Sequence, residues 1–207
     1  MKATIRKNDP TNTRGRVLDA AAGLFSRKGY ADTSMQDIMA AAGVTSGALH
    51  HHYSTKKQLG LAVINERVAA TVEEAWIDPV RNAATAEAGV RKAMTDIIAD
   101  LKEGSIAGCP LNNLALELAY AEPQFGSALQ PIFDRWTQVL ARQIGATGFA
   151  LAGPAATAEE MATLVIAAYS GAMTMAKTGQ SVQPLKAALK LLTRLLEPAP
   201  SIGPADA

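Results

Sequence analysis

The stretch "GVTSGALHHHYSTKK", residues 43–57, decides how this chain of 207 residues is interpreted. Its three consecutive histidines suggest a metal site, but they lie between a glycine-led turn and a lysine-rich helix start. Adjacent side chains of a helix point about 100° apart, so these three cannot converge on one ion. No Asp, Glu or Cys lies three or four residues from them to complete a ligand set. We therefore expect neither a metal nor a cofactor.

The residues on either side of this stretch predict short helices. A helix over residues 13–28 carries one apolar stripe and ends at Gly29, the residue best suited to a left-handed cap. Thr33 and Gln36 have the spacing of a capping box and predict a second helix. Thr45 can cap a third helix of about seven residues. These parts, with a glycine in the turn between the second and third helices, have the organisation of a helix-turn-helix.

The predicted third helix has two different faces. Leu49 and Tyr53 are one turn apart and must face the core. The opposite face is small and polar, and it suits the major groove of DNA, where a helix has to lie close to the bases. That face holds Ser46, Gly47, His50 and His51, and the neighbouring Ala48 adds little bulk.

The charge distribution also favours a polyanionic partner. Residues 1–57 contain nine Lys and Arg against four Asp, whereas the remainder contains eleven basic against fifteen acidic residues. The predicted phosphate contacts are the amides near Thr45 and Ser46 and the side chains of Arg14, Thr33 and Lys56. Residues 1–12 are expected to be a flexible arm, in which Lys2, Arg6 and Lys7 could enter the minor groove.

The rest of the chain predicts a larger helical body. Apolar residues make up 48% of the chain and aromatic residues 5%, and no alternating strand pattern is present. We predict an all-α fold of about nine helices: a three-helix domain over residues 13–57, a body over 58–197 and a disordered tail over 198–207. Beyond the first three, the predicted helices cover about 55–76 (opened by a Thr55–Gln58 capping box and ended by Asp78-Pro79), 86–102, 111–122, 125–144, 158–178 and 184–196.

Specific reading of DNA predicts a dimer, because one small recognition helix contacts only a few base pairs. The last two helices are the candidates for the dimer contact. Ala168, Gly171, Ala172 and Ala176 would allow close packing, and Leu185, Leu189, Leu192, Leu195 and Leu196 form a wide apolar face. The alternative is that both helices cover the core of a single chain.

The run "TSMQDIMAAAGVTSGALHHHYSTKKQL", residues 33–59, resembles the DNA-binding signature of the TetR family of transcriptional repressors. The match covers residues 14–60, whereas the remainder matches in helix number, length and order. His50 replaces the usual tyrosine, which in the family commonly contacts a phosphate, and Tyr53 replaces a phenylalanine. Because histidine changes charge between pH 5 and 8, His50 would make DNA binding more sensitive to pH. The resemblance implies a homodimer on a palindromic operator, assembled through the last two helices and released by a small molecule.

The resemblance also implies an effector pocket in a ligand-binding and dimerisation domain over residues 58–197, where ligand binding moves the long helix at 56–77. Each candidate lining residue could equally belong to an ordinary core. The candidates are Leu101, Ile106, Cys109, Leu114, Leu118, Phe125, Trp136, Tyr169 and Met173. The segment "AGCPLNNLALELA" resembles one found in electrophile-sensing members, so Cys109 is either a reactive thiol at a helix start or an inert buried one.

Other classes of protein are less consistent with the sequence. An enzyme would need a nucleophile–base pair or a metal cluster, and all three histidines lie in one short helix. A helical ligand-binding or interaction protein that has lost DNA binding is the alternative function. One cysteine excludes an internal disulfide framework, and neither a secretion signal nor a membrane span is visible. We expect a soluble cytoplasmic protein of a bacterium, associated with the nucleoid when bound to its operator.

Overall fold

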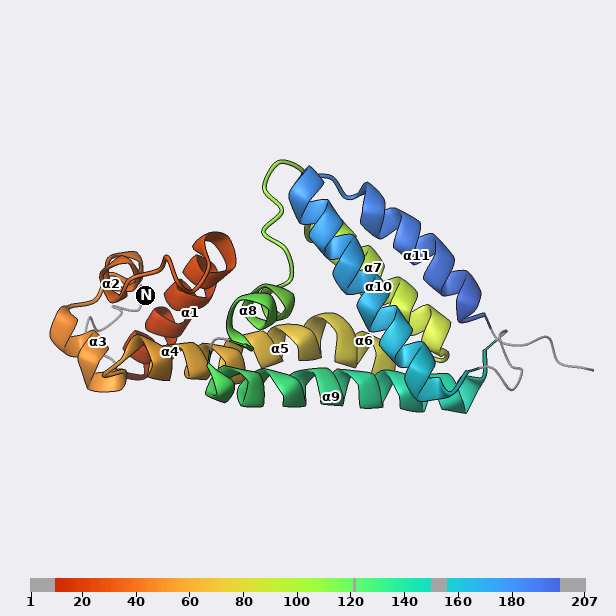
Figure 1. Ribbon diagram of the computed structural model, residues 1–207, viewed down its shortest axis with the longest axis horizontal. Coiled ribbons are helices and arrows are strands. Elements are labelled where there is room, and N and C mark those ends of the chain that lie inside the picture. The colour runs from red at the N-terminus through yellow and green to blue at the C-terminus, as the bar shows by residue number, and fades with distance from the viewer. Residues whose placement is uncertain (1–9, 121, 150–155, 198–207) are drawn as a thin grey trace, which may run out of the picture. The chain divides into compact units, whose positions relative to one another are not determined.

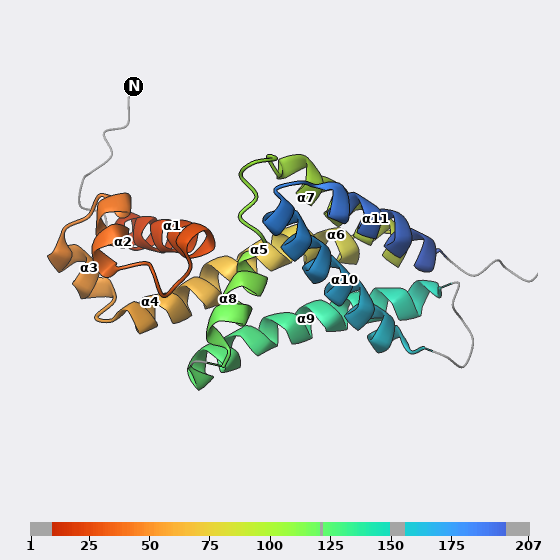
Figure 2. The same ribbon diagram turned by 45° about the horizontal axis from the view of Figure 1, so that its top comes forward.

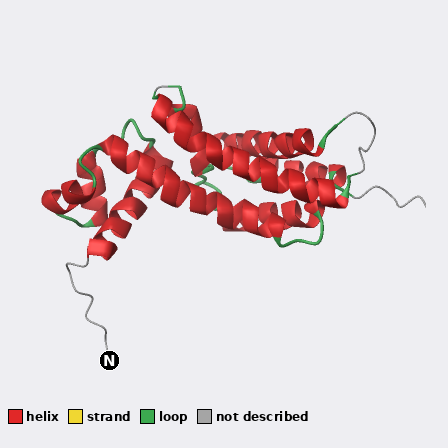
Figure 3. Ribbon diagram, turned by 90° about the horizontal axis from the view of Figure 1, so that it is seen from below, coloured by secondary structure: helices red, strands yellow, loops and turns green. Residues whose placement is uncertain are grey.

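The computed structural model describes residues 10–120, 122–149 and 156–197, which form helices and connecting loops only (Figures 1 and 3). The all-α prediction is confirmed. Within the described residues the chain divides into two compact units. The head unit comprises residues 10–70, 109–120 and 122–130, and the body unit comprises residues 71–108, 131–149 and 156–197. Residues 1–9 of the predicted arm and the predicted tail at 198–207 lie outside the described residues.

The head unit contains the first helices of the chain, through η1, and one segment that follows much later. Its helices are α1 (Pro10–Lys28), α2 (Met35–Ala42), α3 (Ser46–His52), α4 (Lys56–Val63), η1 (Ile64–Val68) and α8 (Pro110–Leu118), with the beginning of α9 (Pro123–Thr147). Helix α1 begins three residues earlier than predicted and ends before Gly29, whose φ of 87° confirms the left-handed cap. Figure 2 shows α2 and α3 packed at one end of α1.

The caps of these helices agree with the sequence in part. Thr45 caps α3, as predicted, and accepts the amide of Ala48. The prediction for α2 was wrong by one residue, because Ser34 and Asp37 form its capping box. The carboxylate of Asp37 accepts from the backbone N–H and the hydroxyl of Ser34, and these hydrogen bonds hold its pKa below the usual range.

The capping box predicted at Thr55 is incomplete in the structure. Thr55 accepts the amide of Gln58, as predicted, but Gln58 Oε1 accepts from the amide of Ser54 instead of Thr55. Hydrogen bonds donated by the amides of Gln58 and Ser54 therefore fix the start of α4, whereas a complete capping box would use those of Gln58 and Thr55.

Large apolar side chains fill the interior of the head unit. The ring of Tyr30 lies between those of Phe25 and Phe125, with ring centroids 5.1 and 5.2 Å away. Helix α4 passes so close that a Cβ at Gly60 would lie 2.8 Å from the Tyr30 ring and 3.0 Å from that of Phe125. Phe125, 0% exposed, is thus part of the core that holds α1 and α4 together.

The fourth predicted helix continues farther than its sequence suggests. The elements α4, η1, α5 (Ala69–Val72), η2 (Glu73–Ile77) and α6 (Asp78–Arg81) follow one another without a break. The prediction that Asp78-Pro79 ends the helix was wrong. The π-helical turn η2 pairs the amide of Asp78 with the carbonyl of Glu73, and Pro79 then occupies the first turn of α6, where its missing N–H is tolerated.

The body unit is built around three aromatic rings. Its remaining helices are α7 (Ala86–Asp100), most of α9, α10 (Ala158–Gly179) and α11 (Gln183–Leu195). Trp76 contacts Trp136 and Tyr169, with ring centroids 4.9 and 4.7 Å away, and all three side chains are buried. Helix α10 begins with a capping box formed by Thr157 and Glu160.

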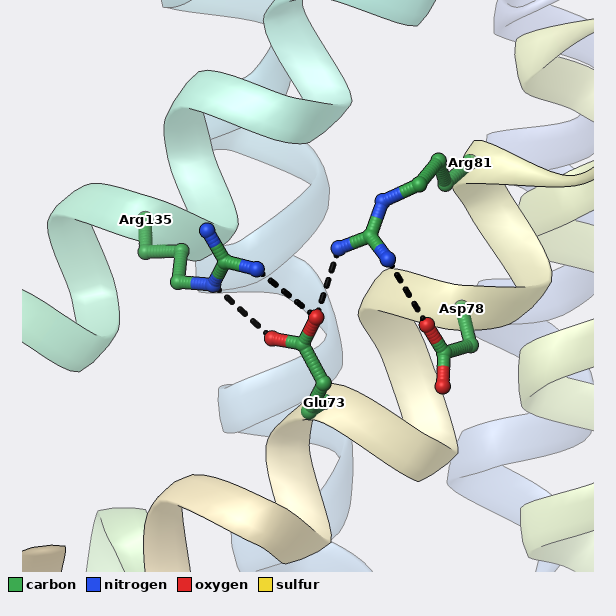
Figure 4. Close-up of polar contacts among 4 residues, drawn as sticks. All are labelled: Glu73, Asp78, Arg81 and Arg135. Carbon is green, nitrogen blue, oxygen red and sulfur yellow. Dashed lines mark hydrogen bonds and ion pairs between the residues drawn. The ribbon is translucent and has the colours of Figure 1, made fainter.

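An ion cluster ties η2, α6 and α9 together within the body unit (Figure 4). Arg135 donates to both oxygens of Glu73, at 2.8 and 2.7 Å, and Arg81 donates to Glu73 at 2.6 Å. Arg81 also reaches Asp78 at 3.0 Å. These guanidinium groups, Arg135 first, lower the pKa of Glu73 to about 2.

No helix of the described chain has both the length and the apolar character that a membrane span requires.

Candidate nucleic-acid interface

A fixed turn presents α3 to the surface of the head unit. Gly43 follows α2 with a φ of 61°, a conformation that favours glycine, and its N–H donates to Ala40. Arg16 of α1 donates to the carbonyls of Ala42 and Gly43, the second at 2.7 Å. The last carbonyls of α2 are therefore paired, and the turn is fixed before α3 begins.

The inner face of α3 is buried as predicted. Leu49 is 0% exposed and Tyr53, which follows the helix, is 6% exposed. Ile38 of α2 is also completely buried. This apolar contact fixes the rotation of α3 about its own axis, and so determines which side chains face outward.

The outer face of α3 consists of exposed, small or polar residues. Ser46, Gly47, His50 and His51 are exposed, whereas Ala48 and His52 are half-buried. A Cβ added at Gly47 would meet nothing within 4 Å. The fold of the head unit therefore does not require glycine at this position.

The histidines do not form a metal site in the described part of the chain, where no three potential ligands gather. His51 and His52 lie with ring centroids 5.2 Å apart, and the ring of His52 is 6.5 Å from that of Tyr53. His50 and His51 thus remain on the outer face, while His52 packs toward the aromatic side of the helix.

Lys56 does not lie on this outer face. Its Nζ donates to the carbonyls of Tyr30, Ala31 and Thr33, at 2.9, 3.1 and 3.0 Å, and lies 4.4 Å from the centroid of the Tyr30 ring. An ammonium group has three N–H donors, and each has a carbonyl here. Lys56 therefore holds the α1–α2 turn, a role that the sequence did not suggest.

Thr33 and Arg14 are also engaged inside the head unit. Thr33 is 1% exposed, its hydroxyl donates to the carbonyl of Gly29 at 2.7 Å, and its amide donates to Tyr30. Arg14 forms a two-bond ion pair with Glu66 and lies over the Tyr53 ring. The hydrogen bond from Arg14 holds the pKa of Glu66 below its usual range. The structure does not bring these two side chains to α3 as phosphate ligands.

Other basic side chains of the head unit have partners as well. Arg67 pairs with Asp19 at 2.7 Å, and Lys57 pairs with Glu122 at 2.7 Å. Lys28 lies 3.6 Å from Asp37. Most of the basic side chains in the described part of the head unit are therefore engaged in contacts within the unit. The partners lie 9 to 65 residues away along the chain, so spacing alone could not reveal them.

The predicted effector residues are divided between the two units. Cys109, Leu114, Leu118 and Phe125 belong to the head unit, and all are buried. Cys109 lies at the N-cap position of α8, where its side chain makes no capping bond. Leu101, Ile106, Trp136, Tyr169 and Met173 belong to the body unit, and all but the half-buried Leu101 are buried.

Sequence reasoning missed Trp76, which completes the aromatic cluster of the body unit. The indole N–H groups of Trp76 and Trp136 are buried, and neither has a hydrogen-bond partner among the described residues. A buried donor without an acceptor costs free energy, so the cluster has two positions where an acceptor would be stabilising.

Comparison with known proteins places this geometry among bacterial transcriptional regulators. The model described as "Bacterial regulatory proteins, tetR family" matches residues 17–63, and the model described as "Transcriptional regulator LmrA/YxaF-like, C-terminal domain" matches residues 86–191.

Individual relatives match over most of their length. An uncharacterized HTH-type transcriptional regulator in the lacX 3' region of Lactococcus lactis subsp. lactis is 27% identical over 190 residues, covering 90% of this chain and 94% of the relative. The HTH-type transcriptional repressor DhaR of Mycobacterium sp. (strain GP1) is 25% identical over 202 residues, covering 91% and 94%. The crystal structure of a TetR transcriptional regulator from Chloroflexus aurantiacus J-10-FL superposes with a TM-score of 0.75 at 27% identity, covering 89% and 93%.

Proposed function

The chain belongs to the TetR family of bacterial regulatory proteins, and from this membership we propose that it is a repressor that binds a palindromic operator as a homodimer and leaves it when a small molecule binds. It is a DNA-binding regulator of transcription rather than an enzyme. In this proposal residues 13–57 read DNA, and residues 58–197 bind the effector and the second subunit.

The outer face of α3 is the observation that carries the proposal. Gly47 is exposed and open in the first turn of α3, where glycine favours the helix less than alanine does. Nothing within the described chain compensates that cost, whereas close approach of a DNA backbone or base edge would. Ser46, His50 and His51 then supply hydrogen-bonding groups beside this gap.

The set of residues proposed to contact DNA is therefore smaller than the set that the sequence suggested. They comprise Thr45, Ser46, Gly47, Ala48, His50 and His51. Arg14, Thr33 and Lys56 support the interface from within the head unit, since their polar groups are engaged there.

The dimer is supported by exposed apolar side chains on the last two helices. Leu164 and Met175 of α10 are 46% and 64% exposed, and Leu191 of α11 is 59% exposed. Gly171, between the first two, has nothing within 4 Å of an added Cβ, so a second helix could approach closely. Ala172, Ala176, Leu185, Leu192 and Leu196, which the sequence also offered for this contact, are buried within the chain instead.

The effector site is proposed at the aromatic cluster of the body unit. Trp76, Trp136 and Tyr169 present flat apolar surfaces, and the two unpaired indole N–H groups favour an effector with hydrogen-bond acceptors. An electrophilic effector would instead react at Cys109, which is only 8% exposed. If a Cys109→Ser variant is no longer released from the operator, the effector reacts at Cys109. If release is normal, the effector binds elsewhere, as at the aromatic cluster.

Selection of DNA from a random pool tests the proposed function. The recovered sequence should contain two inverted half-sites with centres about 34 Å apart, or a multiple of that distance. Affinity should fall linearly on a log–log plot against salt, with a clear preference over random DNA. A purified protein that binds no duplex at low salt would show instead a helical ligand-binding protein that has lost DNA binding.

A further inference from the structure

The turn between α1 and α2, residues 29–34, is held from two sides. On one side Lys56 of α4 donates to three of its carbonyls. On the other side the carboxylate of Glu117 in α8 accepts from two of its amides. Tyr30 N–H donates to Oε2 at 2.8 Å, and Ala31 N–H donates to Oε1 at 2.6 Å. Each carboxylate oxygen therefore has its own backbone donor.

The shape of the turn makes room for this carboxylate. Gly29 has a φ of 87°, and a Cβ built there would lie 3.2 Å from Oε2 of Glu117. The carboxylate thus lies against the bare Cα of glycine, directly beside the two amides that it accepts. Hydrogen bonds to an ionised acceptor are about twice as strong as neutral ones.

Other contacts hold α8 and the start of α9 against the same part of the head unit. Lys57 pairs with Glu122 at 2.7 Å, and the Phe125 ring packs on Tyr30 with centroids 5.2 Å apart. Figures 1 and 2 show α8 beside α1 within this unit. Among these contacts, the carboxylate of Glu117 is bonded directly to the backbone that leads into α2, three residues before the Ser34 cap.

The segment that carries Glu117 follows directly on a loop of the body unit. The chain passes from the body unit to the head unit between residues 108 and 109. Within the body unit, the side chain of Gln180 forms two hydrogen bonds to the loop just before residue 108. Ile106 N–H donates to Gln180 Oε1 at 2.8 Å, and Gln180 Nε2 donates to the Ile106 carbonyl at 3.1 Å. These two hydrogen bonds fix the backbone at Ile106, three residues before Cys109.

We propose that Glu117 is a positioning residue for DNA reading: through its carboxylate, α8 sets the α1–α2 turn and thereby the placement of α2 and α3. The inference rests on the proposed function and adds to it a residue outside the three-helix segment that sets the placement of the reading helix. Glutamine at 117 retains one acceptor but turns an NH₂ group toward a backbone N–H, so it loses one bond and the charge that strengthens the other.

The test compares Glu117→Gln with the control Glu122→Gln, which breaks an exposed ion pair of the same segment. Two measurements are made on the full chain: affinity for the DNA recovered by selection, and hydrogen exchange of the backbone amides. We expect Glu117→Gln to lower affinity for the selected DNA about tenfold at a temperature where its unfolding curve shows a folded protein. Binding to random DNA at low salt should stay unchanged, and exchange should quicken in residues 29–45 but not in 56–68. The control should behave as the wild type.

A loss of selective binding that appears only as the variant unfolds would overturn the proposal, because it would show a purely stabilising contact. Wild-type affinity together with wild-type exchange at residues 29–45 would overturn it as well. If the wild-type chain binds no DNA, the proposed function fails, and hydrogen exchange still decides whether Glu117 holds the turn. Faster exchange confined to residues 29–45 supports the positioning role, and unchanged exchange contradicts it.

Discussion

The α1–α2 turn and the outer face of α3 are both polar surfaces of the head unit, but their polar groups are used in opposite ways. In the turn, Lys56 and Glu117 pair with the backbone, and Thr33 is buried and bonded. On α3, Gly47, His50 and His51 are exposed, and a Cβ added at Gly47 would meet nothing within 4 Å. Polar residues in a sequence therefore do not by themselves identify a binding surface. Polar groups already paired within the chain give the head its shape, and those left over are available to a partner.

The largest change in the free energy of unfolding is expected when the α1–α2 turn loses Lys56. Lys56→Met removes three charge-assisted hydrogen bonds and leaves three carbonyls without their donor, so the free energy of unfolding should fall by about 2 to 3 kcal/mol. Urea denaturation of the full chain measures it. Lys57→Met is the matched control, because its ion pair with Glu122 is 39% exposed on both sides and should contribute less than about 1 kcal/mol. Equal losses of unfolding free energy in the two variants would show that Lys56 stabilises the head unit no more than the exposed Lys57 does.

A smaller change in the free energy of unfolding, of the opposite sign, is expected for a substitution on the inner face of α3. The hydroxyl of Tyr53 is buried without a hydrogen-bond partner among the described residues, and this burial raises the pKa of the phenol. Tyr53→Phe removes the unpaired group and keeps the ring, so stability should be unchanged or higher by about 1 kcal/mol. DNA affinity should not change. A clear loss of thermal stability in this variant would show that the hydroxyl has a partner.

The smallest effect concerns the ion cluster of the body unit, whose charges are also paired within the chain. The pKa of Glu73 is lowered to about 2, mainly by Arg135, so its contribution is present above the unfolded value near pH 4.5 and is lost as the pH falls toward 2. Because the cluster lies at the surface, the loss should be below about 1 kcal/mol. Denaturation of wild type and Glu73→Gln between pH 5 and 2 measures it, and the two curves should converge at low pH. A constant difference between the two curves over this range would contradict the lowered pKa of Glu73.

The sequence predicted those features that depend on residues a few positions apart in the same helix. The burial of Leu49 and Tyr53, the cap at Thr45 and the stop at Gly29 each follow from spacings of a few residues. The choice between Thr33 and Ser34 as the cap of α2 could not be made this way, since both have a polar residue three positions later. The structure favours Ser34, because Asp37 reaches back to it and Thr33 is turned inward.

The sequence could not predict contacts between distant residues. Arg14 and Glu66 are 52 residues apart, and Glu117 is 87 residues from Tyr30. For that reason Arg14 and Lys56 resembled free phosphate ligands, although both have partners in the fold. Pro79 ended the predicted helix because a π-helical turn, which makes room for it, leaves no local pattern in the residues before it.

The most direct test of the central claim, that the outer face of α3 reads DNA, is the affinity of a Gly47→Ala variant for the selected duplex. Alanine fits the described chain and favours the helix, so unfolding stability should be equal or higher. We expect this variant to lose at least tenfold in its affinity for the selected duplex, while its binding to random DNA stays unchanged. Gly145→Ala, at an exposed position of α9 where an added Cβ would lie 3.8 Å from Ala158, should bind as the wild type. Wild-type affinity of the Gly47→Ala variant would show that the outer face of α3 does not read DNA.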